Sequence, residues 1–506
     1  MISSPAKPAQ APAAERHPNV LLVLTDQQRH DSLGCYGAEF ARTPRLDALS
    51  REGVRFDHCY VNNPICTPSR ASLMTGLELP HHGVNRLYDR LGPQHRLFPE
   101  HLREAGYRTG LFGKLHVSDY HAEAAARHPH DGFDVYNWCH EPSLALDSPF
   151  NGYARYLEQR HPAYLERLKA VGRDIREVPA DCHMSHWAAE ATISFIQQTP
   201  TDRPFFALLS LFDPHNPYHD HPPGWDEQID ADRLPQPVGL DEPLADMPEA
   251  IQRESRASHL GGFEDYSPEQ IRQMRQGYHA SVAFLDHQVG RVLDELDRAG
   301  RRENTLVIFT SDHGDMLGDH RLLVKGAFFY DPCTRVPLII RWPGAVPRGG
   351  VAGGLAQLHD LPATILHAAG LAEVARQSMP TAVDLRQMID GRATRPTACC
   401  HYLESGVDAT GSYFDPPIYA SMARTERYKL NAYWTDARCD RVHQGQLFDM
   451  HHDPHELDNL WDRPDLEPLR RGLVDQLRQA LAGSSGPPTA HSASARAVAA
   501  DPASTR

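Results

Sequence analysis

The sequence predicts an α/β protein with a large, mixed and mostly parallel sheet flanked by helices, followed by a smaller C-terminal α+β subdomain. Apolar runs of strand length alternate with helical patterns along most of the chain, which is typical of α/β sheets. Polar residues follow directly after three of those runs, as they do at the carboxyl ends of parallel strands. From about residue 380 the pattern changes to short strands and one helix, which indicates the separate subdomain.

Four apolar runs are the clearest strands. Each is short and almost continuously apolar, a pattern typical of strands that are buried on both faces of a parallel sheet. They are Val20–Thr25, Phe205–Phe212, Thr305–Thr310 and Pro337–Trp342. Residues from about 140 to 265 are richer in Pro, His and charge and only weakly periodic, so we interpret them as insertions around the second of these strands.

The strongest helix signal begins after Ser267. Ser267 can cap the helix, Pro268 suits the first helical position, and Gln270 completes a capping box. Apolar residues then recur at helical spacing until Gly300, where we expect the helix to end. The strand at Thr305 follows at once, so this segment is one helix-to-strand unit of the α/β sheet.

The C-terminal part predicts three short antiparallel strands and a closing helix. These are Ile418–Ala423, Arg427–Tyr433, Gln446–Met450 and the helix Leu466–Leu481. Ala-, Pro- and Ser-rich ends predict disordered tails. The chain therefore divides into a tail at 1–17, a main α/β domain at 18–379, the subdomain at 380–482 and a tail at 483–506.

Composition excludes several classes of protein. The 506 residues carry a formal net charge of -15, which argues against a broad nucleic-acid-binding surface. The nine cysteines include no Cys-x-x-Cys pair, so neither a zinc site nor a disulfide framework is indicated. Residues 1–18 lack the basic start and apolar core of a signal peptide, and no run is long enough to span a membrane. We expect a cytoplasmic protein that binds neither nucleic acid nor membrane.

Three strand ends carry side chains suited to a metal or catalytic site. Asp26 and Gln27 follow the first strand, Asp213 and His215 the second, and Asp312 and His313 the third. Ligands of open α/β sheets bind outside the carboxyl ends of the strands, so we expect these residues to converge. Oxygen ligands favour Ca²⁺ or Mg²⁺, and the imidazole leaves room for Mn²⁺.

A cysteine motif links this site to a known family. Cys66 stands in Cys66-Thr67-Pro68-Ser69-Arg70, ahead of a short apolar helix that Gly76 closes. The run resembles the signature of the type I sulfatases, in which this cysteine is oxidised to formylglycine (3-oxoalanine). Gly106–His116 resembles the second family signature, and the resemblance spans about residues 18 to 480. It implies an alkaline phosphatase-like fold in which 18–379 is the catalytic domain.

The resemblance also implies roles for individual residues. A divalent cation, usually calcium, would be held by Asp26, Gln27, Cys66, Asp312 and His313. The commonest family pattern has Asp-Asp and Asp-Asn at these strand ends, so this chain replaces one carboxylate and gains one nitrogen. Lys114, His215 and Lys325 would bind the sulfate, and His215 and Lys325 would protonate the leaving oxygen. Arg70, Lys114 and His116 would hold the hydrated aldehyde, with His116 as a candidate base.

Formylglycine hydrate offers a geminal diol in place of a simple nucleophile. One hydroxyl accepts the sulfuryl group, and loss of a proton from the other releases sulfate and restores the aldehyde. Pro68 begins a helix, so we expect Cys66 just before an N-terminus that favours anions. The expected substrate is a small sulfate ester, and the expected partners are a formylglycine-generating enzyme and, as an open option, a second copy of the chain.

Two other functions fit the same residues. A phosphonate monoester or phosphodiester hydrolase would use the same fold, metal and nucleophile. A metal-binding protein with an unmodified Cys66 would lack turnover. Ser69 in the signature favours sulfate, and the retention of every motif residue favours an enzyme, a sulfuric ester hydrolase of the arylsulfatase kind.

Overall fold

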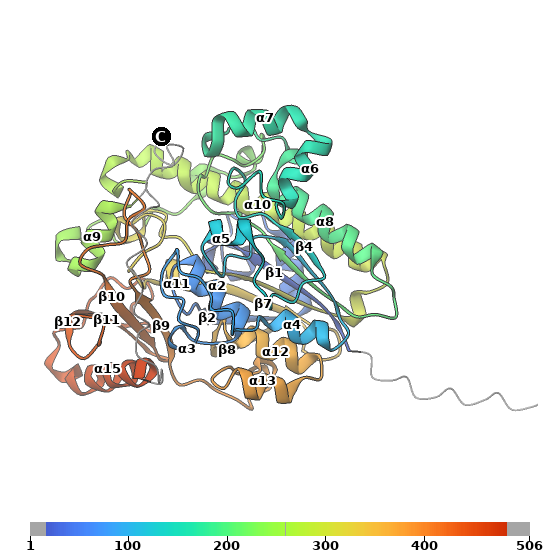
Figure 1. Cartoon of the computed structure of the whole chain (residues 1–506). Helices are drawn as coiled ribbons and strands as arrows, with labels where there is room; N and C mark the ends of the chain where they lie inside the picture. The colour runs from blue at the N-terminus through green and yellow to red at the C-terminus, as the bar shows by residue number, and fades with distance from the viewer. Residues whose placement is uncertain (1–16, 259, 483–506) are drawn as a thin grey trace, which may run out of the picture.

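The computed structural model describes residues 17–258 and 260–482, so the predicted tails lie almost entirely outside the described residues (Figure 1). Within those ranges the chain forms an eight-stranded sheet and a four-stranded sheet. The predicted architecture, a large mostly parallel sheet followed by a small antiparallel one, is confirmed. The boundary at residue 379 stays a prediction.

The large sheet has the order β4-β3-β5-β1-β6-β7-β2-β8. Every strand runs in one direction except β7, which is antiparallel to both of its neighbours. Its strands are β1 (Asn19–Thr25), β2 (Val54–Tyr60), β3 (Arg108–Gly113), β4 (Val135–Trp138), β5 (Phe205–Ser210), β6 (Thr305–Ser311), β7 (Arg335–Arg341) and β8 (Gly350–Gln357). The small sheet has the order β12-β11-β10-β9, with strands β9 (Ala398–Leu403), β10 (Tyr419–Arg424), β11 (Tyr428–Trp434) and β12 (Val442–Asp449).

Helices cover both faces of the large sheet. The helices of the described residues are α1 (Pro44–Glu52), α2 (Cys66–Thr75), α3 (Leu79–His82), α4 (Phe98–Glu104), α5 (Tyr120–Ala125), α6 (Gly152–Arg160), α7 (Pro162–Val171), α8 (Met184–Gln198), α9 (Glu249–Ala257), α10 (Pro268–Arg298), α11 (Asp331–Thr334), α12 (Asp360–Ala368), α13 (Ala372–Ser378), α14 (Leu385–Ile389) and α15 (Glu467–Ala482). Figure 1 shows α8 and α10 side by side on one side of the sheet and α2, α4 and α12 on the other.

The side chains of β1 alternate between the two faces of the large sheet, which explains why helices must cover both faces. Val20, Leu22 and Leu24 pack into the core shared with α2, α4 and α12, whereas Leu21 and Val23 pack into the core shared with α1, α8 and α10. Successive side chains of a strand point to opposite faces, so a strand that is apolar at every position must be covered twice. All seven residues of β1 are buried accordingly.

The structure corrects three details of the predicted elements. The strand predicted at Pro337–Trp342 is β7, and it is antiparallel, because a continuous apolar run records burial but not direction. The strand predicted at Phe205–Phe212 ends at Ser210. Residues 140–265 are more than insertions, since they include α8, a 15-residue helix of the layer that covers the sheet.

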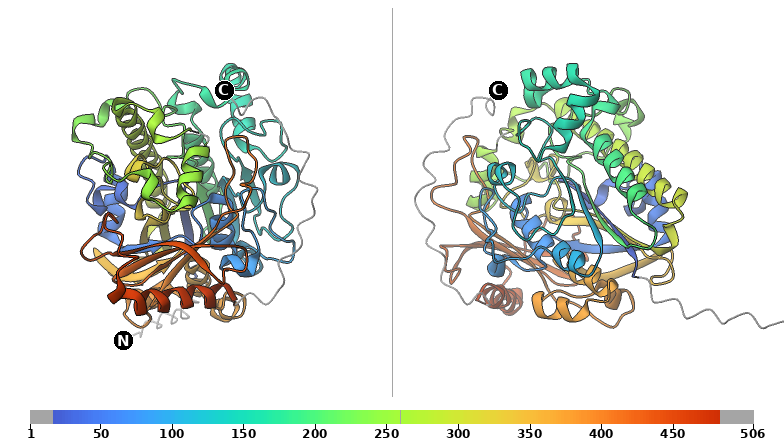
Figure 2. Two further views of the ribbon diagram at one scale, coloured as in Figure 1. Left: turned by 90° about the vertical axis from the view of Figure 1, so that its left-hand side faces the viewer. Right: turned by 45° about the vertical axis from the view of Figure 1, so that its right-hand side comes forward.

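The long helix forms as predicted. Ser267 Oγ accepts from the Gln270 N–H, and the Gln270 side chain accepts from the Ser267 N–H. The helix ends at Arg298, two residues before Gly300. The strands β10, β11 and β12 and helix α15 confirm the C-terminal predictions with shifts of a few residues at their ends. Figure 2 shows α15 lying against one face of the small sheet, where Leu473, Val474 and Leu477 are buried.

The small sheet is joined to the large one by buried polar contacts. The side-chain amide of Asn63 donates to the Ser405 hydroxyl at 2.7 Å, and Lys429 Nζ lies 2.9 Å from Asp331 Oδ1 and 2.8 Å from Glu456 Oε1. These contacts hold the loop before α2 and the start of α11 against the C-terminal strands. In the described part of the chain, no helix combines the length and apolar character needed to cross a membrane.

Candidate active site at the ends of β1 and β6

Cys66 is the first residue of α2, one position further into the helix than the sequence indicates. The Asn63 side chain accepts a hydrogen bond from the Ile65 N–H at 2.7 Å and so shapes the turn into the helix. Ser69 Oγ donates to the Asp312 carbonyl at 2.6 Å, which ties α2 to the end of β6. Cys66 is buried at the positive end of the helix dipole, a place that favours an anion.

Arg70 joins the carboxylates that follow β1 and β6. Its Nε donates to Asp312 Oδ2 at 2.6 Å, and its Nη2 donates to Asp26 Oδ2 at 3.2 Å. Its Nη1 donates to the Lys114 carbonyl and to Ser210 Oγ, both at 3.0 Å. Four of the five guanidinium N–H groups are therefore occupied, and Arg70 is above all the residue that holds the two carboxylates in place.

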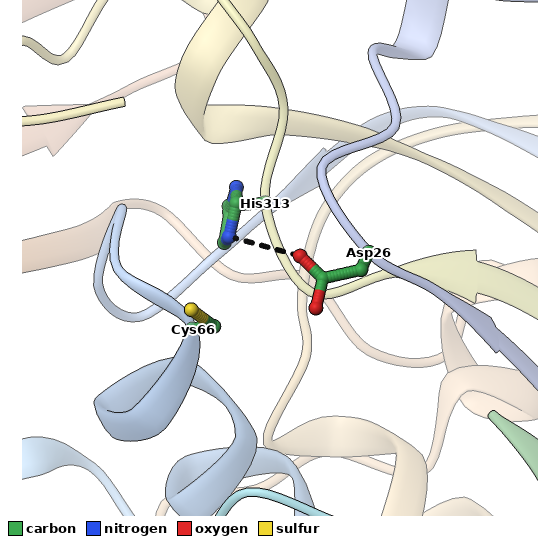
Figure 3. Close-up of side chains that lie close together, drawn as sticks. All are labelled: Asp26, Cys66 and His313. Atoms are coloured by element: carbon green, nitrogen blue, oxygen red, sulfur yellow. Dashed lines mark ion pairs between the residues drawn. The ribbon is translucent and has the colours of Figure 1, made fainter. Parts of the chain in front are cut away.

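The remaining ligand atoms at these strand ends point toward one another. Asp26 Oδ1 and His313 Nε2 lie 3.6 Å apart, both are buried, and neither has a hydrogen-bond partner among the described residues. Together with Cys66 Sγ they lie within 4.8 Å of one another (Figure 3). Asp312 Oδ1 lies 3.7 Å from the same His313 nitrogen. Buried polar atoms are rarely left unpaired, so this oxygen and nitrogen set fits a divalent cation well.

Gln27 takes a different part from the other predicted ligands. Its Oε1 accepts from Lys325 Nζ at 2.7 Å, and its Nε2 donates to Asp315 Oδ2 at 2.6 Å. Its backbone has a φ of 68°, in the left-handed region, and its N–H donates to Asp312 Oδ1 at 3.1 Å. The Gln27 amide therefore links Lys325 to Asp315, which lies just after β6.

Lys114 completes the charge balance around Asp26. Its Nζ lies 2.7 Å from Asp26 Oδ2, and both side chains are almost fully buried. Burial raises the pKa of the Asp26 carboxyl, but Lys114 and further nearby cations outweigh that effect and hold it well below its usual range. Asp26 is therefore ionised, as a metal ligand must be.

His116 is a buried, neutral imidazole next to Lys114. Thr67 Oγ1 donates to the Leu87 carbonyl and lies 2.8 Å from His116 Nε2, so Nε2 carries the ring proton and Nδ1 the lone pair. That Nδ1 is buried without a hydrogen-bond partner among the described residues. Burial and the adjacent Lys114 charge lower the pKa of His116 well below its ordinary value, which keeps the ring neutral.

His215 and Lys325 form a pair on the other side of the site. His215 Nδ1 lies 2.7 Å from the Asn216 carbonyl, so Nδ1 carries the proton and Nε2 accepts from Lys325 Nζ at 2.9 Å. Burial, followed by the charge of Lys325, lowers the pKa of His215 well below its ordinary value. The transferable proton of this pair is therefore on Lys325.

The Cys66 thiol lies in a cationic environment. Burial raises its pKa, but Lys325, Lys114 and the neighbouring His313 outweigh burial and bring the pKa to about 7. An unmodified Cys66 is thus divided about evenly between thiol and thiolate at neutral pH.

All ten predicted site residues meet at this edge of the sheet. The structure adds residues that the sequence analysis missed, among them Asn63, Thr67, Ser210 and Glu123. Asn63 stands close before Cys66 and could have been noticed as a turn residue. Glu123 carries no local signal. Asp213, although it follows β5, turns away from the site and accepts from the Ser185 hydroxyl.

Known proteins share this chain's sequence and fold. The family model "Sulfatase" matches residues 18–371, and the model "N-sulphoglucosamine sulphohydrolase, C-terminal" matches residues 318–482. A choline-sulfatase of Rhizobium meliloti is 30% identical over 91% of this chain and 84% of its own length. An arylsulfatase of Clostridium perfringens is 26% identical over 91% of this chain and 94% of its own.

A solved structure supports the same fold. The phosphonate monoester hydrolase of Agrobacterium radiobacter superposes with a TM-score of 0.75 at 23% identity, covering 92% of this chain and 95% of its own. At that identity the likeness shows the fold alone. The family model covers well over half of the chain, so the chain belongs to the sulfatase family and is a sulfuric ester hydrolase.

Proposed function

We propose that the chain hydrolyses a small sulfate monoester to an alcohol and inorganic sulfate, with formylglycine made from Cys66 as its nucleophile. The observation that carries the proposal is the position of Cys66, at the first turn of α2 and facing unpaired ligand atoms and two lysines. The hydrated aldehyde supplies one hydroxyl that attacks sulfur and a second whose deprotonation releases sulfate. A formylglycine-generating enzyme is therefore a required partner.

We also propose one divalent cation at the strand ends, with Ca²⁺ first and Mn²⁺ or Mg²⁺ as alternatives. Asp26, Asp312, His313 and the modified residue 66 would hold it, with Gln27 as a further ligand if its amide leaves Lys325. When bound, the cation supplies Lewis-acid polarisation of a sulfate oxygen. Arg70 keeps both carboxylates aimed at this point.

The other site residues divide into two groups by the proton states described above. His116 has an unpaired Nδ1 lone pair and is the proposed base that accepts the proton of the second hydroxyl. Lys325 carries a proton, is held by His215 and Gln27, and is the proposed donor to the leaving oxygen. Lys114, His215 and Lys325 together offer positive charge and hydrogen bonds to the sulfate oxygens.

We propose that the group hydrolysed is a sulfate ester and not a phosphonate ester. Ser69 keeps the usual sulfatase form of the signature, and the two curated relatives described above are named as sulfatases. The test is a pair of assays on the matured enzyme, one with an aryl sulfate and one with an aryl phosphonate monoester that share a leaving group. We expect the higher kcat/KM with the sulfate. A large preference for the phosphonate would replace this proposal with the hydrolase alternative.

The third possibility is a metal-binding protein that keeps its thiol. The low pKa of Cys66 would suit a thiolate ligand beside Asp26 and His313. Two lysines, two histidines and the α2 signature are more than such a site needs, so we favour the enzyme.

A further inference from the structure

A segment far from the family signatures brings one more cation to the site. Helices α6 and α7 lie together outside the large sheet, at the top of Figure 1. The chain leaves α7 at Gly172, whose φ of 66° and ψ of -138° favour glycine and turn it back toward the protein. Arg173 follows in a single 3₁₀ turn, Gly172–Asp174.

Arg173 reaches the loop that carries His215. Its Nη2 donates to the Asn216 carbonyl at 2.7 Å and lies 3.3 Å from His215 Nδ1. Lys325 contacts the opposite nitrogen of the same ring. Arg173 therefore lies on the edge of the imidazole away from Lys325, outside the ring of groups proposed to hold the sulfate.

The guanidinium of Arg173 is only partly satisfied. Its Nη1 lies 3.8 Å from Glu141 Oε2, an ion-pair distance that is too long for a hydrogen bond. Its Nε–H is buried and has no hydrogen-bond partner among the described residues. The side chain is 38% exposed, whereas the Arg70 side chain is 0% exposed. Arg173 thus contacts His215, is partly exposed to solvent, and has an Nη1 group that is held only by the long contact with Glu141.

We propose that Arg173 binds a second anionic group carried by the alcohol part of the substrate, such as a carboxylate or a further sulfate. The inference rests on the proposed sulfatase function. Lys325 and Arg173 contact opposite nitrogens of the His215 ring, so an alcohol whose oxygen meets Lys325 would bring a second anion on its far side toward Arg173. The guanidinium is a charged hydrogen-bond donor suited to planar or tetrahedral anions. Neutral esters bind the sulfate pocket alone, and esters with the second anion bind both positions.

The test compares two aryl sulfates that differ only in a carboxylate or a carboxamide on the ring. We expect the matured enzyme to prefer the carboxylate, and Arg173→Ala to lower the kcat/KM ratio of carboxylate to carboxamide by about tenfold, mainly through KM. Arg173→Lys keeps the positive charge but loses the planar, forked set of N–H donors, so it should retain part of the preference for the carboxylate ester. Arg176→Ala, an exposed arginine three residues on, is the matched control and should leave the ratio unchanged.

Two results would overturn the inference. An equal loss for both esters in Arg173→Ala would mean that Arg173 only holds His215 and Asn216. Unchanged kcat/KM values for both esters would mean that Arg173 does not face the substrate.

A binding measurement separates this inference from the proposed function. Cys66→Ala protein cannot turn over, so calorimetry reports its dissociation constants for the two esters whether or not the wild type hydrolyses them. Tighter binding of the carboxylate ester that disappears on Arg173→Ala supports the subsite even if no ester is hydrolysed. Equal binding of both esters contradicts it.

Discussion

Arg70, Lys114, Asp26 and Asp312 form a buried network of opposite charges directly beneath Cys66. Desolvating these groups costs free energy that their mutual attraction and hydrogen bonds must offset. The network is therefore better understood as a device that fixes carboxylates for a ligand than as a source of stability. Its parts are interdependent, and removing one leaves the others unpaired.

Arg70→Ala tests that interdependence. The change leaves Asp26 and Asp312 without their shared cation, and we expect it to lower the free energy of unfolding by about 3–5 kcal/mol. Urea denaturation followed by far-ultraviolet circular dichroism measures the loss. Arg463→Ala removes an arginine from the exposed pair with Asp465 and should cost less than about 1 kcal/mol. Equal effects of the two changes would mean that the buried network does not depend on Arg70.

His215→Ala tests the division of labour at the leaving oxygen. Without His215, Lys325 loses the group that positions its proton, so aryl sulfates with poor leaving groups should lose the most activity. A series of aryl sulfates with graded phenol pKa values measures the slope of log kcat/KM, which we expect to steepen. His219→Ala, on the same loop, serves as the control. A uniform loss of activity across the series would mean that His215 and Lys325 take no part in protonating the leaving oxygen.

At the scale of secondary-structure elements, the short helix α5 holds the loop that carries His116 in place. Glu123 on α5 accepts hydrogen bonds from the backbone N–H groups of His116, Val117 and Ser118 and from the Trp138 indole. His116 has a φ of 57°, a conformation that few non-glycine residues adopt. Glu123 thus holds the loop that presents the proposed base.

Glu123→Ala leaves these buried donors unpaired, and each costs about 1–3 kcal/mol. We expect a lower melting temperature and a kcat reduced more than the affinity for sulfate, because the loop carries His116 rather than most of the sulfate contacts. Differential scanning fluorimetry and product inhibition by sulfate measure the two effects. Glu104→Ala, an exposed glutamate at the end of α4, is the control. An unchanged kcat in a folded Glu123→Ala protein would contradict the positioning role.

The elements also show what local sequence can and cannot predict. Asp26, Asp312 and His313 were predictable because they follow strands whose carboxyl ends meet at one edge of the sheet. Cys66 was predictable only from its resemblance to the family signature. Strand β8, Gly350–Gln357, contains three glycines and was missed, because packing against β2 rather than its own propensity makes it a strand. Arg173 and Glu123 act on partners that only tertiary structure brings close, and no local pattern marks them.

In the molecule as a whole, the C-terminal sheet supports both sides of the active site. Asn63, before Cys66, bonds Ser405, and Glu254 on α9 accepts from Tyr402 of β9 and from the Ala327 N–H beside Lys325. Burial raises the pKa of Glu254 to about 8. The folded protein thus keeps a proton there that the unfolded chain releases near its ordinary pKa of about 4.3.

This difference predicts how stability depends on pH. Raising the pH from about 4.3 to 8 removes a proton that only the folded state retains, so Glu254 lowers the free energy of unfolding across that interval by at most about 1.4 kcal/mol per pH unit. Glu254→Gln should flatten the wild-type slope, as measured by urea unfolding at pH 5, 6, 7 and 8. Glu249→Gln, exposed on the same helix, should not. Identical slopes in all three proteins would refute a protonated Glu254.

The central claim is that Cys66 becomes the formylglycine of a sulfatase. The most direct measurement is the mass of the peptide that contains residue 66, from protein expressed in its native host and digested with a protease. We predict the mass loss that corresponds to replacement of the thiol-bearing CH₂SH by an aldehyde. A peptide that carries only the unmodified thiol would contradict the claim and favour the metal-binding alternative.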